Sequence, residues 1–170
     1  SWLFPSWVAV FIICFCFYYL FRIFYFSMHQ VAGYFKVKRN MKKDWLKELK
    51  GKDWKKIYHV IILPAYKENQ EIIEESVESL IKSDYPKEKM IVVLAIEERS
   101  GKVFEEQAKS IAKKYADRFY KFIITVHPSG IKEEISGKGS NTAWASQEVK
   151  GKIIDKLKIP YENILISTFD

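Results

Sequence analysis

Residues 57–69 read IYHVIILPAYKEN, an apolar and β-branched run followed at once by a polar turn. Pro64 ends the run, and the turn leads into an amphipathic segment. A short buried strand followed directly by a helix is typical of the first unit of a parallel β-sheet. Because ligands of such sheets bind beyond the carboxyl ends of the strands, this turn is a candidate binding element.

The chain after this segment alternates between strand-like and helix-like patterns. We predict strands over residues 58–63, 90–96, 119–126 and 164–169, and helices over residues 69–82, 103–116 and 141–149, with a further helical turn over 153–157. Such alternation predicts parallel βαβ units with right-handed crossovers. The predicted fold class for residues 57–170 is therefore α/β, a Rossmann-like and mostly parallel sheet with flanking helices.

The N-terminal segment is apolar and aromatic. Residues 2–26 contain a single charged residue, Arg22, and they exceed the length of about 20 residues that a helix needs to cross a bilayer. The segment is too long and too aromatic for the core of a signal peptide. We predict a transmembrane helix over residues 1–28 and an integral membrane protein, with a buried core helix as the alternative.

A basic block occupies residues 29–56, which carry ten basic and three acidic residues. By the positive-inside rule, this flank and the domain after it are cytoplasmic. The block is either an interfacial segment that lies on anionic lipid or an ordinary solvated helix. Much of the net charge of +7 lies here, beside the apolar segment, which favours a membrane surface over nucleic acid as partner.

The sequence excludes several common sites. Cys14 and Cys16 both lie in the apolar segment and form neither a disulfide framework nor a zinc spacing. A P-loop is excluded because Gly139, not Ser or Thr, follows Lys138. The first turn, PAYKEN, has no glycine and therefore no dinucleotide fingerprint.

Charged residues follow several of the predicted strands. Four carboxylates are expected to converge at the carboxyl edge of the sheet, namely Glu68, Glu97, Glu98 and Asp170. Convergent carboxylates suit a hard cation that would neutralise a diphosphate. Lys138, between two glycines and just before a predicted helix, suits a phosphate group.

Several segments in order resemble family-2 glycosyltransferases of the GT-A fold. The run VIILPAYKEN resembles the family's first strand and its P-A-Y-N-E turn, and ESVESLIKSDYP resembles the helix after it. Residues 137–141, GKGSN, resemble the family's G-K-x-x-x-N segment. Residues 164–170, ILISTFD, resemble the strand that delivers the DxD metal motif, with Asp170 as its first aspartate.

The resemblance implies roles for eight residues in binding a nucleotide sugar: Pro64, Ala65, Tyr66, Glu68, Glu97, Lys138, Asn141 and Asp170. The first four would hold the nucleoside, with the Glu68 carboxylate on the ribose. Glu97 stands where the family usually has an aspartate that contacts the base. Lys138 and Asn141 would lie near the base and the diphosphate. Asp170 would contact the sugar nucleotide and a metal, Mn²⁺ or Mg²⁺.

The chain departs from the family pattern in one turn. Glu97-Glu98-Arg99 replaces the usual Asp-Asp-Gly-Ser type of turn, which leaves the identity of the nucleotide open. The chain begins at Ser1 and ends directly after a strand-like run, so it reads as the N-terminal portion of a longer protein. The base that deprotonates the acceptor in an inverting transfer is expected beyond residue 170, so no catalytic residue is assigned and the fragment is expected to be inactive alone.

From the residues alone, we predict a membrane-anchored α/β domain with a cleft for an anionic ligand, and the resemblance implies a membrane-bound, metal-dependent and inverting glycosyltransferase. It would transfer sugar from a UDP-sugar or GDP-sugar to a lipid-linked or polysaccharide acceptor at the cytosolic face. The alternative is a non-catalytic, membrane-anchored module that binds a nucleotide or serves as a scaffold.

Overall fold

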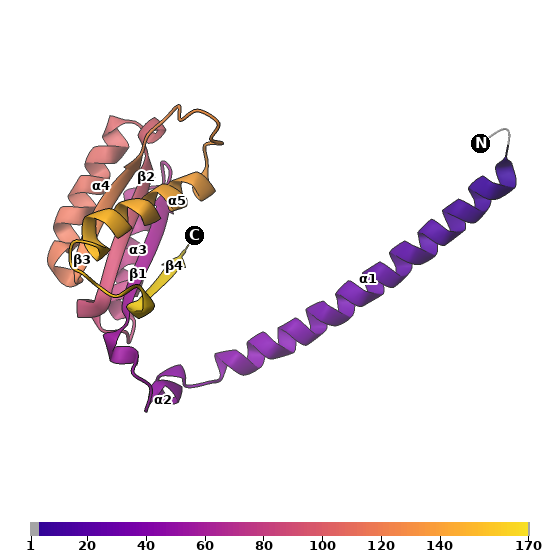
Figure 1. The fold of residues 1–170 in the computed structure, drawn as a ribbon, viewed down its shortest axis with the longest axis horizontal. Helices are drawn as coiled ribbons and strands as arrows, with labels where there is room; N and C mark the ends of the chain where they lie inside the picture. The colour runs from indigo at the N-terminus through magenta and orange to yellow at the C-terminus, as the bar shows by residue number, and fades with distance from the viewer. Residues whose placement is uncertain (1–3, 170) are drawn as a thin grey trace. The chain divides into compact units, whose positions relative to one another are not determined.

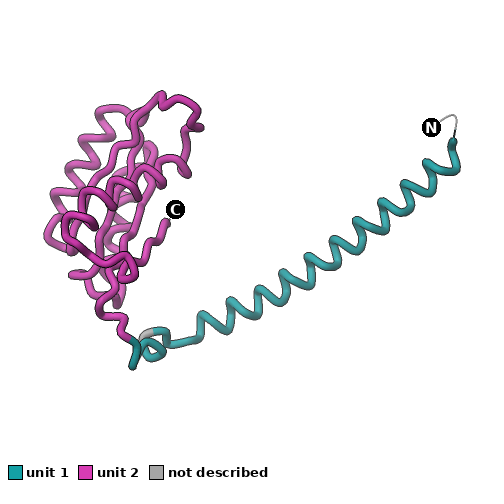
Figure 2. The backbone as a smooth tube through the Cα atoms, viewed as in Figure 1, with its two compact units in different colours: residues 1–52 teal, residues 53–170 magenta. Residues whose placement is uncertain are grey.

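The computed structural model describes residues 4–169 of the chain. These residues divide into two compact units, residues 1–52 and residues 53–170, which Figure 2 shows in different colours. The first unit is helical, whereas the second contains a sheet with helices around it. Each unit is described by itself below.

The first unit is dominated by helix α1, Pro5–Met41. Proline suits the first turn of a helix, because the amide that it lacks would have no partner inside the helix. None of the residues of α1 is buried, and the helix is long and apolar enough to cross a membrane. It does not end at residue 28 but continues without a break into the basic segment. The described chain therefore gives no support to a buried core helix here.

The rest of the basic segment forms only short elements. Helix α2, Trp45–Leu49, begins at Asp44, whose side chain accepts a hydrogen bond of 3.0 Å from the amide of Lys47. In the second unit, Trp54 lies in a single 3₁₀ turn and packs against Tyr85, with 6.0 Å between the ring centroids. One aromatic residue of the basic segment thus packs on the α/β domain.

The second unit is built on a sheet of four parallel strands (Figure 1). The strands are β1, Tyr58–Ala65; β2, Met90–Glu97; β3, Lys121–His127; and β4, Ile164–Thr168. Their order across the sheet is β3-β2-β1-β4, and all three pairings are parallel. The predicted α/β class and parallel sheet are confirmed.

Helices cover both faces of this sheet. Helix α3, Gln70–Lys82, and helix α4, Lys102–Tyr115, share one core with alternate residues of β1 and β2. Helix α5, Lys138–Val149, covers the other face (Figure 1). Successive side chains of a strand point to opposite faces, so Ile61 contacts the first core and Ile62 the second.

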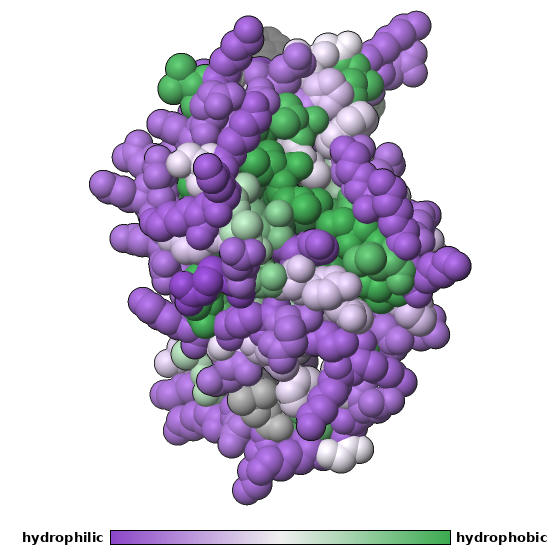
Figure 3. All heavy atoms as spheres, turned by 90° about the vertical axis from the view of Figure 1, so that its left-hand side faces the viewer, coloured by the Kyte–Doolittle hydropathy of each residue, from purple (hydrophilic) through white to green (hydrophobic). Residues whose placement is uncertain are grey.

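The two edges of the sheet differ in exposure. Phe122 and Ile124 of β3 are partly buried and pack against the core. Figure 3 shows one face of the molecule on which hydrophobic residues gather between hydrophilic ones. Leu165 and Ile166 of β4 are 52% and 49% exposed. Helix α5 continues into a π-helical turn, Lys150–Ile154, whose Ile153 and Ile154 are buried, close to the helical turn predicted over 153–157.

The strand order determines where a candidate site can lie. The chain moves from β1 to β2 to β3 in one direction and then returns to place β4 on the other side of β1. In parallel sheets, such a reversal leaves a crevice at the carboxyl ends of the strands, where ligands bind. The turn after β1 lies at this crevice.

Candidate functional site

A pocket of about 250 Å³ lies beyond the carboxyl ends of β1 and β2. Its lining comes from three places in the chain: the end of β1 and its turn, the end of β2, and the first residues of α5. The lining residues are Pro64, Ala65, Tyr66, Glu68, Glu97, Arg99, Lys138 and Asn141. Separate segments thus converge on one small, polar pocket.

Most of the residues predicted for nucleotide-sugar binding line this pocket. They are Pro64, Ala65, Tyr66, Glu68, Glu97, Lys138 and Asn141. Asp170, the eighth, lies outside the described residues. Arg99 was not predicted as a site residue, although its place directly after two strand-end carboxylates was a usable signal. The pocket brings the predicted residues together, and their role in binding stays a prediction.

The turn after β1 is held in a defined shape. Lys67 has a φ of 63°, in the left-handed region that few side chains adopt. The turn is closed by the Glu68 carboxylate, which accepts a hydrogen bond from the amide of Tyr66. The carboxylate of Glu68 is therefore held at the pocket, next to the backbone of Tyr66.

Glu97, at the end of β2, forms an acidic wall of the pocket. Its side chain is only 5% exposed, and it accepts a hydrogen bond from Nε of Arg99. The guanidinium carbon of Arg99 lies 4.6 Å from the centroid of the Tyr66 ring. The cation–π contact therefore links the turns that follow β1 and β2, and the ion pair holds Arg99 against the end of β2.

Asn141 contributes a buried acceptor to the same pocket. The residue is 1% exposed, and its Nδ2 donates a hydrogen bond of 2.8 Å to the carbonyl oxygen of Ala95. Its Oδ1 is buried and has no hydrogen-bond partner among the described residues. A buried acceptor without a partner costs about 1–3 kcal/mol, so this oxygen is a natural contact for a donor from a ligand.

The N-terminus of α5 adds positive potential. Gly137 is the N-cap of the helix. The hydroxyl of Ser140 donates a hydrogen bond of 2.8 Å to the carbonyl oxygen of Gly137 and accepts one of 3.1 Å from the Gly137 amide. Lys138 is the first residue of the helix and lines the pocket. A helix N-terminus with a lysine beside it favours an anionic group.

Glu98 is not in the pocket lining, in contrast to the expected convergence of four carboxylates. It turns toward the next loop, where it accepts hydrogen bonds of 2.8 and 2.7 Å from the amide and the hydroxyl of Ser129. These bonds lower the pKa of Glu98 below its usual value. The sequence predicted that Glu98 lies at the end of a strand, but it did not predict that its side chain turns away from the pocket toward Ser129.

A second contact holds the same loop. Nε2 of buried His127 lies 2.7 Å from a carboxylate oxygen of Glu134, within ion-pair distance but without the direction that a hydrogen bond requires. The ring of His127 also meets that of Trp144 edge-on, with 5.6 Å between the centroids. The loop before α5 is therefore tied to the ends of β2 and β3.

The described residues do not assemble a metal site. Within residues 4–169, no group of three or more His, Cys, Asp and Glu side chains is placed to hold a metal ion. In the pocket, Glu97 is paired with Arg99, and Glu68 accepts from a backbone amide. The predicted Mn²⁺ or Mg²⁺ therefore depends on Asp170, outside the described part of the chain.

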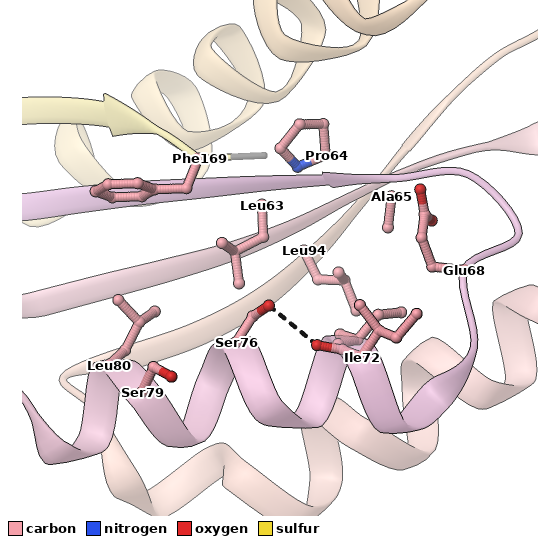
Figure 4. A pocket seen from close by; sticks show the side chains of 11 residues that line it. Leu63, Pro64, Ala65, Glu68, Ile72, Ser76, Ser79, Leu80, Leu94 and Phe169 are labelled. Atoms are coloured by element: carbon pink, nitrogen blue, oxygen red, sulfur yellow. Dashed lines mark hydrogen bonds between the residues drawn. The ribbon is translucent and has the colours of Figure 1, made fainter.

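A larger and more apolar cavity of about 410 Å³ adjoins this pocket between α3 and the strands (Figure 4). It shares Pro64, Ala65 and Glu68 with the polar pocket, and Leu80, Leu94 and Phe169 add apolar walls. Figure 4 shows Ser76 bonded to the carbonyl of Ile72, at 3.0 Å, on its own helix. We place the site in the smaller pocket because the charged groups converge there.

We compared the chain with known protein families, curated proteins and solved structures. The chain matches no protein-family model, no curated protein and no solved structure.

Proposed function

We propose that the chain is the donor-binding part of a membrane-bound glycosyltransferase similar to family 2, with a GT-A type of domain. The full reaction would transfer a sugar from a nucleotide-sugar donor to a lipid-linked or polysaccharide acceptor at the cytosolic face of the membrane. The observation that carries the proposal is the polar pocket at the carboxyl ends of β1 and β2.

The pocket contains the groups that a nucleoside diphosphate needs. Tyr66 offers an aromatic face and Glu68 a carboxylate that can accept from ribose hydroxyls. Lys138 and the N-terminus of α5 suit the diphosphate. The buried acceptors of Glu97 and Asn141 suit the N–H groups of a base. One pocket thus offers a contact to each part of the nucleotide.

The fold and the anchor support the same proposal. The sheet order reverses beside β1, next to the pocket, as in other parallel sheets that bind nucleotides. Helix α1 would place this domain at a bilayer, where a lipid-linked acceptor is found. The basic residues after the apolar part of α1 favour the cytosolic face.

Chemistry beyond donor binding needs groups that the described residues do not supply. In an inverting transfer, a base deprotonates the acceptor hydroxyl, and none of the lining residues is assigned that role. A divalent cation, when bound, would stabilise the charge of the leaving diphosphate. Within residues 4–169, the carboxylates do not form a group that fits a metal by themselves.

Calorimetric titration of UDP and GDP into the detergent-solubilised chain, with and without Mn²⁺, tests the proposal. We expect binding of at least one of the two, weakened about tenfold in Glu68→Gln by loss of a hydrogen bond to a charged group. Glu71→Gln, in the exposed first turn of α3, is the matched control and should bind as the parent does. Absence of binding by any nucleotide would overturn the proposal.

A second candidate is a non-catalytic nucleotide-binding or scaffold module. It is favoured by the pairing of Glu97 with Arg99 and by the lack of a metal cluster within residues 4–169. Metal dependence separates the two candidates. If the protein is a transferase, Mn²⁺ should tighten nucleotide binding, and Asp170→Ala should remove this effect. If it is a non-catalytic module, nucleotide binding should be equal with and without the metal.

A further inference from the structure

We propose that Arg99 selects the nucleobase, so that the pocket takes uracil or guanine nucleotides and rejects cytosine and adenine nucleotides. The inference rests on the proposed function, because it names the class of nucleotide that the same pocket binds. It assigns a binding role to a residue outside the set implied by the resemblance, since a glycine is usual at this place in that family.

The position of Arg99 is fixed by two contacts. Nε donates to the carboxylate of Glu97, and the guanidinium carbon lies 4.6 Å from the ring centroid of Tyr66. Its side chain is 41% exposed and lines the pocket. The guanidinium is therefore held in place before a ligand arrives, which reduces the entropy lost on binding.

The same contacts leave donors available. A guanidinium has five N–H donors, and within residues 4–169 the hydrogen bonds of Arg99 use Nε alone. The groups on Nη1 and Nη2 can donate to a ligand. The pocket thus presents a fixed donor directly beside a fixed acceptor, the carboxylate of Glu97, which is 5% exposed.

This pair matches one type of base edge. Uracil and guanine carry a ring N–H next to a carbonyl oxygen, so the N–H can donate to Glu97 while the oxygen accepts from Arg99. Cytosine and adenine reverse the pattern, with a ring nitrogen acceptor next to an amino group. The glycosidic bond fixes the order of the two positions, so the reversed edge would face acceptor to acceptor and donor to donor.

Neither of the other nearby cations offers this combination. Lys67 lies 5.3 Å from the centroid of the Tyr66 ring and is not in the pocket lining. Lys138 belongs to the N-terminus of α5, where an anionic group is favoured. Among the residues that line the pocket, Arg99 is the cation bonded to the buried carboxylate.

The experiment compares the dissociation constants of UDP, GDP, CDP and ADP for the full chain in detergent. The parent should bind UDP or GDP at least about tenfold more tightly than CDP and ADP, within the range for a good paired contact to a base. In Arg99→Ala, binding of the preferred nucleotide should weaken about tenfold while that of CDP and ADP stays the same, so the selectivity is lost. Arg99→Lys keeps the positive charge but loses the planar guanidinium with its paired N–H donors, so this variant should retain part of the selectivity between nucleotides.

Arg118→Ala is the matched control, because Arg118 is exposed in a 3₁₀ turn before β3, at the opposite end of that strand from the pocket. Circular dichroism of each variant separates a binding effect from a folding effect. Equal weakening of all four nucleotides in Arg99→Ala, unchanged selectivity, or tighter binding would each overturn the inference while leaving the proposed function in place. Failure of the parent to bind any nucleotide would overturn both.

Discussion

Asn141 joins two elements of the domain through one side chain. Its Nδ2 donates to the carbonyl of Ala95 in β2, while its backbone belongs to α5. We expect Asn141→Ala to lower the free energy of unfolding by about 1–3 kcal/mol, because a buried carbonyl would lose its donor. Urea denaturation followed by circular dichroism measures this change. Gln147→Ala, on the exposed side of the same helix, is the control and should stay within about 0.5 kcal/mol of the parent.

Glu98 shows which part of a site is hard to predict from sequence. Its place at the end of a buried apolar run indicated a strand-end carboxylate, and β2 does end one residue earlier. The direction of its side chain depends on Ser129, which lies 31 positions away in the sequence. The same holds for Arg99, whose contact with Tyr66 requires the pairing of β1 with β2. Residue type and position were predictable, whereas contacts between separate turns were not.

His59 couples β1 to the edge strand β4. Its Nε2 lies 2.9 Å from Oγ of Ser167, and burial lowers the pKa of the ring from 6.5. A lowered pKa in the folded state means that stability is complete above the unfolded pKa and falls as the pH drops through the folded pKa. We expect the free energy of unfolding to decrease below about pH 6.5, the unperturbed pKa of histidine, and part of this decrease to vanish in His59→Gln.

Urea midpoints measured from pH 7.5 down to pH 5 would test the role of His59 at this strand pair. A pH profile in His59→Gln that is identical to that of the parent would assign the acid sensitivity to groups outside the β1–β4 pair.

The N-cap of helix α4 is Gly101, whose backbone conformation is one that residues with a side chain rarely adopt. Gly101 has a φ of 91°, yet a Cβ atom placed there would meet no atom within 4 Å. The cost of Gly101→Ala should therefore come from backbone conformation alone, about 1–3 kcal/mol of unfolding free energy, because a positive φ with an extended ψ of 161° is a region that almost only glycine adopts. Gly151→Ala, in the helical turn after α5 and equally open, should be neutral or stabilising. Destabilisation of similar size in both would contradict this explanation.

The elements themselves were largely predictable, for reasons that individual residues make clear. β2 is buried at every position, and its apolar run MIVVLAI fixed the strand from sequence. The predicted strand over 119–126 begins earlier than β3, which starts at Lys121, because Phe119 is buried outside the strand. Helix α1 exceeds its predicted end because helical propensity continues through the basic residues after the apolar run. Hydropathy locates a bilayer core, but it does not mark where a helix stops.

At the scale of the whole molecule, the length of α1 connects the anchor to the basic segment. Its 37 residues span about 55 Å as a helix, against about 30 Å for a hydrocarbon core. If the apolar residues up to 26 occupy that core, the turns with Lys36, Lys38 and Arg39 extend beyond it. Long basic side chains at this position reach anionic head groups.

The basic end of α1 predicts the orientation of the chain in a bilayer. Positively charged flanks remain on the cytoplasmic side, so a reporter fused after residue 170 should lie in the cytoplasm. In bacterial cells, we expect a fluorescent-protein fusion to be bright and an alkaline phosphatase fusion to be inactive, with both in the carbonate-resistant membrane fraction. Changing Lys36, Lys38 and Arg39 to Gln and adding lysines at Ser6 and Trp7 should increase phosphatase activity, because the excess of charge would then lie at the other end of the helix. An active phosphatase fusion of the parent chain would place the proposed nucleotide pocket on the side without nucleotide sugars and remove the support that the anchor gives to the proposed function.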